Sequence, residues 1–90
     1  MAAENFLRAG AKALGLKTPD LGRLPKGGPE KVALAWWLRR RTTVSLRWVG
    51  ERLEMGHYTR VTQAASRMNR KPGRKLRALG ETLRALENET

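Results

Sequence analysis

Residues 45–70 read SLRWVGERLEMGHYTRVTQAASRMNR, and their arrangement of apolar, small and basic residues predicts the fold around them. The apolar residues follow helical spacing twice, which predicts helices over 45–55 and 59–71 with a short polar corner between them. Gly50 in the first helix leaves room for a close crossing, and Gly56 in the corner tolerates a positive φ. Two short helices joined in this way are typical of a helix-turn-helix.

The second of these helices has a slim apolar face and a long polar face. Val61, Ala64 and Ala65 form the slim face, which allows close packing against the first helix. The polar face carries arginine and glutamine, whose side chains pair with guanine and adenine edges in the major groove of DNA. The pattern therefore predicts base-reading positions on this face, namely Arg60, Gln63 and Arg67.

The neighbouring His57 and Tyr58 also raise the question of catalysis, because each is the only residue of its type in the chain. A catalytic site needs partner groups, and the sequence offers no paired carboxylates in the motif region, no Gly-rich phosphate loop and no Ser/His/Asp set. The chain has no cysteine, so disulfides and thiolate metal sites are excluded. We therefore expect no enzyme activity, no metal ion and no cofactor.

The remaining sequence predicts an all-α fold, a small bundle of about five helices. Further helices are expected over 3–15, 29–41 and 74–88, and a Pro- and Gly-containing connector over 16–28. The chain length predicts one domain over 1–90, in which 1–28 is the N-terminal helix and connector, 29–71 the core and 72–90 the C-terminal helix. Trp36 and Trp37 are expected to pack in the core, and a partner-facing aromatic patch is the alternative.

The net charge of +11 is concentrated in one part of the chain. Thirteen Lys or Arg and two Glu lie between Lys31 and Arg77, whereas the charges outside this range cancel. A localised basic surface is typical of proteins that bind polyanions, of which nucleic acid is the first candidate. An anionic membrane surface and an acidic protein remain as alternatives. No apolar run approaches the about 18 residues of a membrane span, and the N-terminus does not resemble a signal peptide.

A helix-turn-helix contacts the phosphates of DNA through basic and hydroxyl side chains beside its second helix, the recognition helix, which is here the helix over 59–71. Most of the candidates surround the start of the helix over 45–55, and others lie in the connector or beyond the recognition helix. The predicted phosphate contacts are Lys26, Arg39, Arg40, Arg41, Thr43, Ser45, Arg47, Arg70, Lys71 and Arg74.

Residues 24–68 resemble the C-terminal helical region of REP-associated tyrosine transposases and related transposase-like proteins. The resemblance rests on Pro25-Lys26-Gly27, Pro29, Lys31, Ala35, Leu38-Arg39, Thr42, Ser45-Leu46, Trp48-Val49, Leu53 and Met55-Gly56. It implies a DNA-binding part of a transposase-like protein. The transposase chemistry needs a paired-histidine metal motif and a nucleophilic tyrosine in a separate domain. A chain with a single histidine cannot carry that motif, so Tyr58 is not expected to cleave DNA.

A weaker similarity links the same region to the DNA-binding domain of the replication initiator DnaA. Thr42, Ser45, Leu46, Val49, Gly50 and Val61 fall in register with its T-x-x-SL-x-x-IG motif and the helix that follows. The similarity implies base contacts from His57, Tyr58, Thr59 and Arg60 and a phosphate contact from Arg39. Tyr58 replaces the family's histidine and His57 its aspartate, so a different DNA sequence is expected.

The sequence-based hypothesis is therefore sequence-specific binding of double-stranded DNA by a cytoplasmic, nucleoid-associated bacterial protein. A structured-RNA binder is one alternative, for which Trp36 and Trp37 would have to face solvent. A basic protein–protein module is another. Leucines at heptad-like spacing in the last helix either dock on the domain, which is favoured, or form a homodimer through Leu76, Leu79, Leu83 and Leu86.

Overall fold

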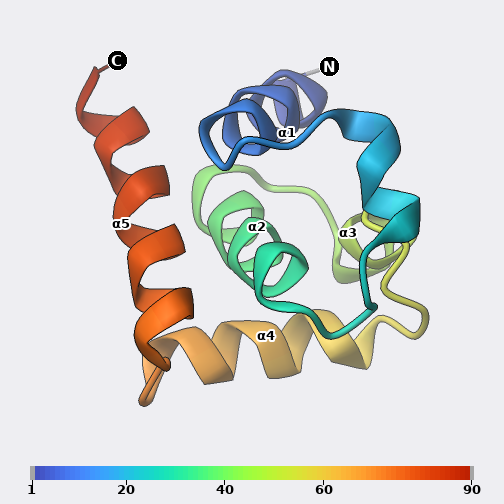
Figure 1. The fold of residues 1–90 in the computed structure, drawn as a ribbon. Helices are drawn as coiled ribbons and strands as arrows, with labels where there is room; N and C mark the ends of the chain where they lie inside the picture. The colour runs from blue at the N-terminus through green and yellow to red at the C-terminus, as the bar shows by residue number, and fades with distance from the viewer. Residues whose placement is uncertain (1, 90) are drawn as a thin grey trace.

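A computed structural model describes residues 2–89 of the chain as a bundle of α-helices without strands (Figure 1). The predicted all-α fold is thus confirmed. Met1 and Thr90, the ends of the predicted domain, lie outside the described residues. The elements in chain order are α1 (Ala2–Ala13), the 3-10 helix η1 (Thr18–Arg23), α2 (Pro29–Arg41), α3 (Leu46–Arg52), α4 (Thr59–Asn69) and α5 (Arg74–Glu89).

Helix α2 is the centre of the bundle. It begins with Pro29 directly after Gly28, in the first-turn position where a missing N–H costs nothing. Every residue from Lys31 to Leu38 is buried, because α1 packs on one side of α2, α4 on the opposite side, and α5 along a third (Figure 1). The remaining elements therefore take their positions from α2.

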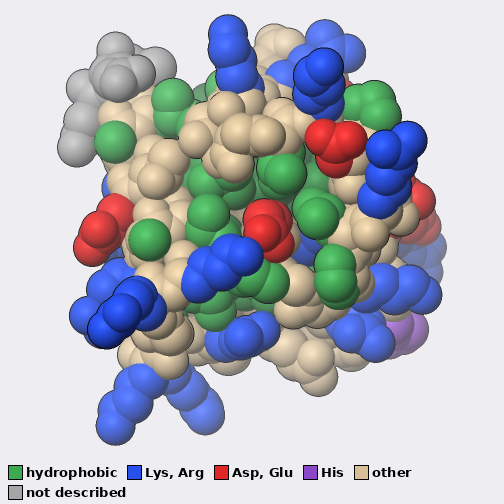
Figure 2. All heavy atoms as spheres, viewed as in Figure 1, with side chains coloured by type: hydrophobic (Ala, Val, Ile, Leu, Met, Phe, Trp, Pro, Cys, Tyr) green, Lys and Arg blue, Asp and Glu red, His purple; other side chains and the backbone are tan. Residues whose placement is uncertain are grey.

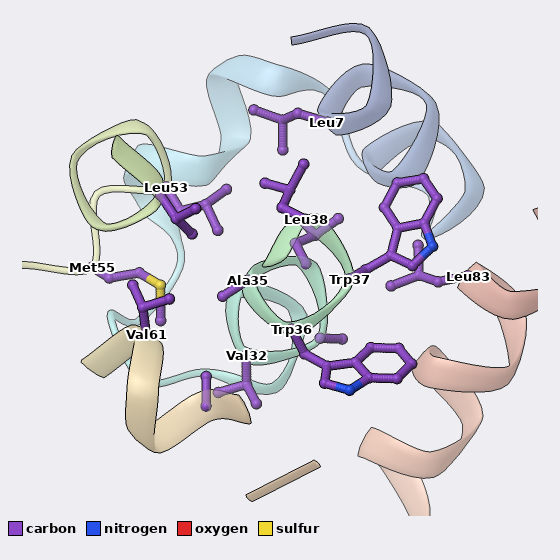
Figure 3. Packing of buried hydrophobic residues seen from close by; sticks show 14 of the residues in the cluster. Leu7, Val32, Ala35, Trp36, Trp37, Leu38, Leu53, Met55, Val61 and Leu83 are labelled. Atoms are coloured by element: carbon purple, nitrogen blue, oxygen red, sulfur yellow. The ribbon is translucent and has the colours of Figure 1, made fainter. Parts of the chain in front are cut away.

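The two neighbouring tryptophans of α2 are both core residues, as expected. Trp36 is 6% exposed and Trp37 is 2% exposed, and they point toward α5 and α1 respectively (Figure 3). The Trp37 ring meets Phe6 edge to face, with centroids 5.7 Å apart. The Trp36 ring lies within 5.7 Å of both the Arg40 and the Arg84 guanidinium groups, which favours cation–π attraction.

Helix α5 uses its leucine seam within the chain. Leu76 and Leu83 are buried, and Leu79 and Leu86 are partly buried against the same core. The helix is further held by Lys75, whose ammonium lies 3.3 Å from the Glu30 carboxylate. A homodimer through these leucines would first require α5 to leave the domain.

The helix boundaries differ from the sequence-based expectation in the connector and by one to three residues at several helix ends, among them α1, which ends at Ala13 rather than at residue 15. Residues Thr18–Arg23 form a 3-10 turn rather than an extended connector, because the Asp20 carboxylate accepts the Lys17 N–H at 3.1 Å and Leu21 is fully buried. Helix α3 ends at Arg52, shortly before Glu54 takes a positive φ of 54°, and α4 ends at Asn69. No helix within 2–89 is long and apolar enough to span a membrane.

An ion pair joins α1 to α3. The Glu4 carboxylate accepts hydrogen bonds from Arg52 Nε and, at 3.1 Å, from Arg52 Nη2. The hydrogen bond from Arg52 holds the pKa of Glu4 below its ordinary value, although partial burial acts in the opposite direction. Stability from this pair is present above pH 4.5 and is lost as the pH falls through the lowered pKa of Glu4.

Replacing Glu4 with glutamine should therefore lower the free energy of unfolding by about 1 kcal/mol at pH 7, the size typical of a well-aligned, partly exposed pair. Urea unfolding at pH 7 and pH 3 measures the effect, and Glu81→Gln on the exposed side of α5 is the matched control. The difference between wild type and Glu4→Gln should shrink at pH 3. An equal difference at both pH values would mean that the charge of Glu4 is not responsible.

Candidate nucleic-acid interface

Helices α3 and α4 are the two helices for which the sequence predicts a helix-turn-helix, and they cross at Gly50. A Cβ atom at Gly50 would lie 3.4 Å from Tyr58 Cα and 3.6 Å from Val61 Cγ2, so the two helices meet at this residue. Val61 and Ala64 are buried against the core, as the slim inner face of α4 requires. Their burial leaves the opposite face of α4 exposed to solvent.

The corner between α3 and α4 depends on two residues with positive φ. Gly56 has φ 85°, as expected for a turn glycine, whereas Glu54 has φ 54° in a region that side chains rarely occupy. The Met55 N–H closes the end of α3 by donating to the Gly50 carbonyl at 2.9 Å. The corner therefore has a defined backbone shape, which fixes the start of α4.

A buried lysine, which sequence reasoning did not identify, supports this corner. Lys31 of α2 is 1% exposed, and its ammonium donates to the Glu54 carbonyl at 2.9 Å. Burial is the main cause that lowers the pKa of Lys31. The nearby charge of Lys26 adds to this effect, and Glu54 opposes it. The spacing of Lys31, Leu34 and Leu38 at i, i+3 and i+7 is a signal that could have placed the lysine on the inner face.

His57 and Tyr58 lie together at the start of α4. Their rings are stacked with centroids 4.3 Å apart and an interplanar angle of 30°. His57 Nδ1 accepts the Thr59 N–H at 3.3 Å and lies 3.0 Å from Thr59 Oγ1. Because Nδ1 acts as an acceptor, the neutral ring carries its proton on Nε2. Tyr58 is 45% exposed and is the one large hydrophobic residue of the described chain that is exposed.

The predicted base-reading residues share one exposed surface. Arg60, Gln63 and Arg67 recur along the outer side of α4. Thr59 is the first residue of this helix, and His57 and Tyr58 precede it in the corner; all six residues are exposed. Figure 2 shows Lys and Arg side chains gathered along the lower edge of the molecule, where α4 and the start of α5 lie. Arg70, Lys71 and Arg74 are exposed and extend this basic surface beyond α4.

The connector before α2 lies against the same surface. Arg67 Nη1 donates to the Gly27 carbonyl at 3.4 Å, and a Cβ atom at Gly27 would lie 3.6 Å from Arg60 Nη1. A hollow of about 120 Å³ separates connector and helix; it is lined by Gly27, Val32, Met55, Arg60, Gln63, Ala64 and Arg67. The structure thus brings Lys26 and Gly27 next to the base-reading positions, although they are more than thirty residues away in sequence.

The predicted phosphate contacts at the end of α2 lie elsewhere. Arg39 donates to the Val44 carbonyl at 2.5 Å, Arg40 lies 3.5 Å from the Glu87 carboxylate, and Arg41 covers the Phe6 ring at 5.5 Å. These contacts, and the hollow that Thr43 shares with α1, place this group on the α1 and α5 side of α2, away from α4 (Figure 1). Its members are exposed, but they do not adjoin the base-reading residues.

Ser45 and Arg47 occupy the first turn of α3 and its cap. Ser45 Oγ accepts the Trp48 N–H at 3.0 Å, so this hydroxyl caps the helix. Arg47 lines a hollow together with Glu51, Gly56, His57 and Tyr58. Arg47 therefore belongs to the corner surface, whereas the Ser45 hydroxyl has a structural hydrogen bond of its own.

Comparisons with known proteins do not extend these observations. The scan against family models, the search of curated proteins and the search of solved structures each give no match for this chain. The resemblance to transposase and initiator domains therefore rests on the motif residues alone, and the function has to be argued from the geometry of this surface.

Proposed function

We propose that the protein binds double-stranded DNA in a sequence-specific manner, with α4 in the major groove. The observation that carries this proposal is the division of α4 into a buried face of small residues and an exposed face that bears Arg60, Gln63 and Arg67. A helix with its side chains is about 10–12 Å wide, and the major groove of B-DNA is about 12 Å wide. The long donors on α4 can therefore reach base edges.

The distribution of charge supports the same proposal. Arg70, Lys71 and Arg74 continue the basic surface past the end of α4, and Arg47 and Lys26 flank its beginning. Contacts of this kind hold phosphates on both sides of a groove and release counterions, so affinity should fall steeply as salt rises. The resemblance to transposase-like proteins fits a DNA-binding part of such a protein, and a nucleoid location would follow.

The alternatives receive less support from the same structure. RNA sequence readers usually stack unpaired bases on exposed aromatic rings, but Trp36 and Trp37 are buried. A protein–protein module built on the leucine seam would need Leu76 and Leu83, which pack in the domain's own core. Double-stranded DNA therefore remains the best-supported partner.

Selection of bound duplexes from a random pool, followed by sequencing, should yield a defined motif. Against the selected duplex, Gln63→Ala should relax the choice at one base pair, since a bidentate pair discriminates by about 1–3 kcal/mol. Arg70→Ala, the matched control for a phosphate contact, should weaken all duplexes about equally and reduce the salt slope by about one. A pool that yields no motif, or a preferred RNA competitor, would contradict the proposal.

A further inference from the structure

Two cationic side chains from distant parts of the sequence meet over a glycine of the corner. A Cβ atom placed on Gly56 would lie 3.8 Å from Lys26 Nζ and 3.7 Å from Arg60 Nε. The Arg60 guanidinium also reaches the connector, because a Cβ atom placed on Gly27 would lie 3.6 Å from Arg60 Nη1. The Arg60 guanidinium thus lies across the gap between connector and corner. We call these two residues the Lys26–Arg60 cluster.

The cluster contains positive charge without a matching carboxylate. Among the side chains that the structure describes, no carboxylate oxygen lies within 4.0 Å of the Lys26 ammonium or the Arg60 guanidinium. A further cation, Lys31, is buried close enough for the Lys26 charge to act on it, although the Glu54 charge acts on Lys31 in the opposite direction. Like charges on neighbouring side chains repel each other, and a bound anion offsets the repulsion.

The surroundings of the cluster fit an anion of the nucleic-acid backbone. Lys26, Gly27, Gly56 and Arg60 are all exposed, and the two glycines place no side chain in front of the donors. Lys and Arg donors contact phosphate oxygens at about 2.7–2.9 Å, and guanidinium groups suit phosphate geometry in particular. The cluster also lies beside Gln63 and Arg67, which share the hollow between connector and α4. A strand that meets α4 therefore passes the cluster.

We propose that Lys26 and Arg60 hold one and the same backbone phosphate of the bound duplex. This inference rests on the proposed function and changes one part of it: Arg60 positions the backbone rather than reading a base. Base choice then depends on the remaining base-reading positions, namely His57, Tyr58, Thr59, Gln63 and Arg67. The connector thereby becomes a second DNA-contacting element, which fixes the register of α4 in the groove.

Methylphosphonate scanning of the selected duplex tests the proposal, because each substituted position removes the charge of one phosphate. In wild type, we expect the methylphosphonate at one position to weaken binding strongly. In Lys26→Ala and in Arg60→Ala, the methylphosphonate at that same position should weaken binding no further. Each variant should reduce the salt slope by about one and keep the base preference of wild type. Arg60→Lys should keep the effect of that position. Lys12→Ala, an exposed charge removal on α1, should keep the wild-type profile.

Different outcomes separate this inference from the function on which it rests. If Lys26→Ala and Arg60→Ala became insensitive to methylphosphonates at two different positions, the shared contact would be overturned, while DNA binding would stand. A loss of base preference in Arg60→Ala, with the phosphate effect retained, would return Arg60 to base reading. A wild-type protein that selects no duplex would overturn the proposed function itself. Circular dichroism of each variant checks that these exposed substitutions leave the helices intact.

Discussion

Replacing Trp37 with alanine is expected to lower the free energy of unfolding by about 3–5 kcal/mol, the range for a large aromatic residue removed from a core. Trp37 is 2% exposed and points toward α1 (Figure 3). Its ring meets the Phe6 ring of that helix edge to face. A Cβ atom at Gly10 of α1 would lie 2.8 Å from the Trp37 ring, so α1 follows the shape of this side chain closely. Domains of this size have a total stability of about 5–15 kcal/mol, so the loss is a large fraction of it.

Trp37→Phe is the informative control for this substitution. The Trp37 Nε1–H is buried and has no hydrogen-bond acceptor among the described residues. An unpaired buried donor costs about 1–3 kcal/mol, and phenylalanine removes it while keeping an aromatic ring. We therefore expect Trp37→Phe to stay within about 2 kcal/mol of wild type, because the lost donor offsets part of the lost volume.

Chemical denaturation measures the free energy of unfolding of both variants and thermal denaturation their melting temperature, each followed by far-ultraviolet circular dichroism because it does not rely on tryptophan fluorescence. For the alanine variant, a decrease in melting temperature of at least about 12 °C is expected for a chain of this length. A loss below about 1 kcal/mol in Trp37→Ala would contradict the packing of α1 on α2. Equal losses in both variants would show that the indole ring is required as a whole.

Local sequence patterns were sufficient for the order of the helices and for the tight corner between α3 and α4. Gly50 marks the crossing because a side chain there would meet α4, and Gly56 marks the turn because its φ is positive. The apolar spacing of the second helix of the pair placed Val61 and Ala64 correctly in the core.

The arrangement of the candidate site was harder to predict, because it depends on contacts between distant segments. Spacing in sequence says nothing about where the connector docks, so the proximity of Gly27 to Arg60 and Arg67 was not foreseen. Lysine is almost never buried, so Lys31 was counted as part of the basic surface. The arginines at the end of α2 contact α1 and α5, through Phe6 and Glu87, rather than α4.

Lys31→Ala is the second substitution with a large expected effect, about 2–5 kcal/mol in the free energy of unfolding. It removes a buried stem and also the donor for the Glu54 carbonyl, which belongs to the strained corner. Lys31→Met is the matched control, because it keeps most of the stem and removes only the ammonium group. A buried charge with a single close acceptor contributes little net stability, so the methionine variant should remain within about 1.5 kcal/mol of wild type.

The pH dependence of these two proteins separates the charge of Lys31 from its packing. Burial lowers the pKa of Lys31 from 10.5, so the unfolded chain binds more protons than the folded chain between the lowered pKa and 10.5. The free energy of unfolding of wild type relative to Lys31→Met should therefore rise with pH across this window. Below the lowered pKa of Lys31, the buried charge destabilises the folded state by its full amount. Urea unfolding at pH 7 and at pH 10 measures the difference. A difference that falls with rising pH would contradict the buried, desolvated state of the ammonium group.

Binding of the selected duplex at pH 7 then tests whether Lys31 supports the corner between α3 and α4. If it does, Lys31→Met should bind the duplex more weakly although the domain remains folded, because the Glu54 carbonyl has lost its donor.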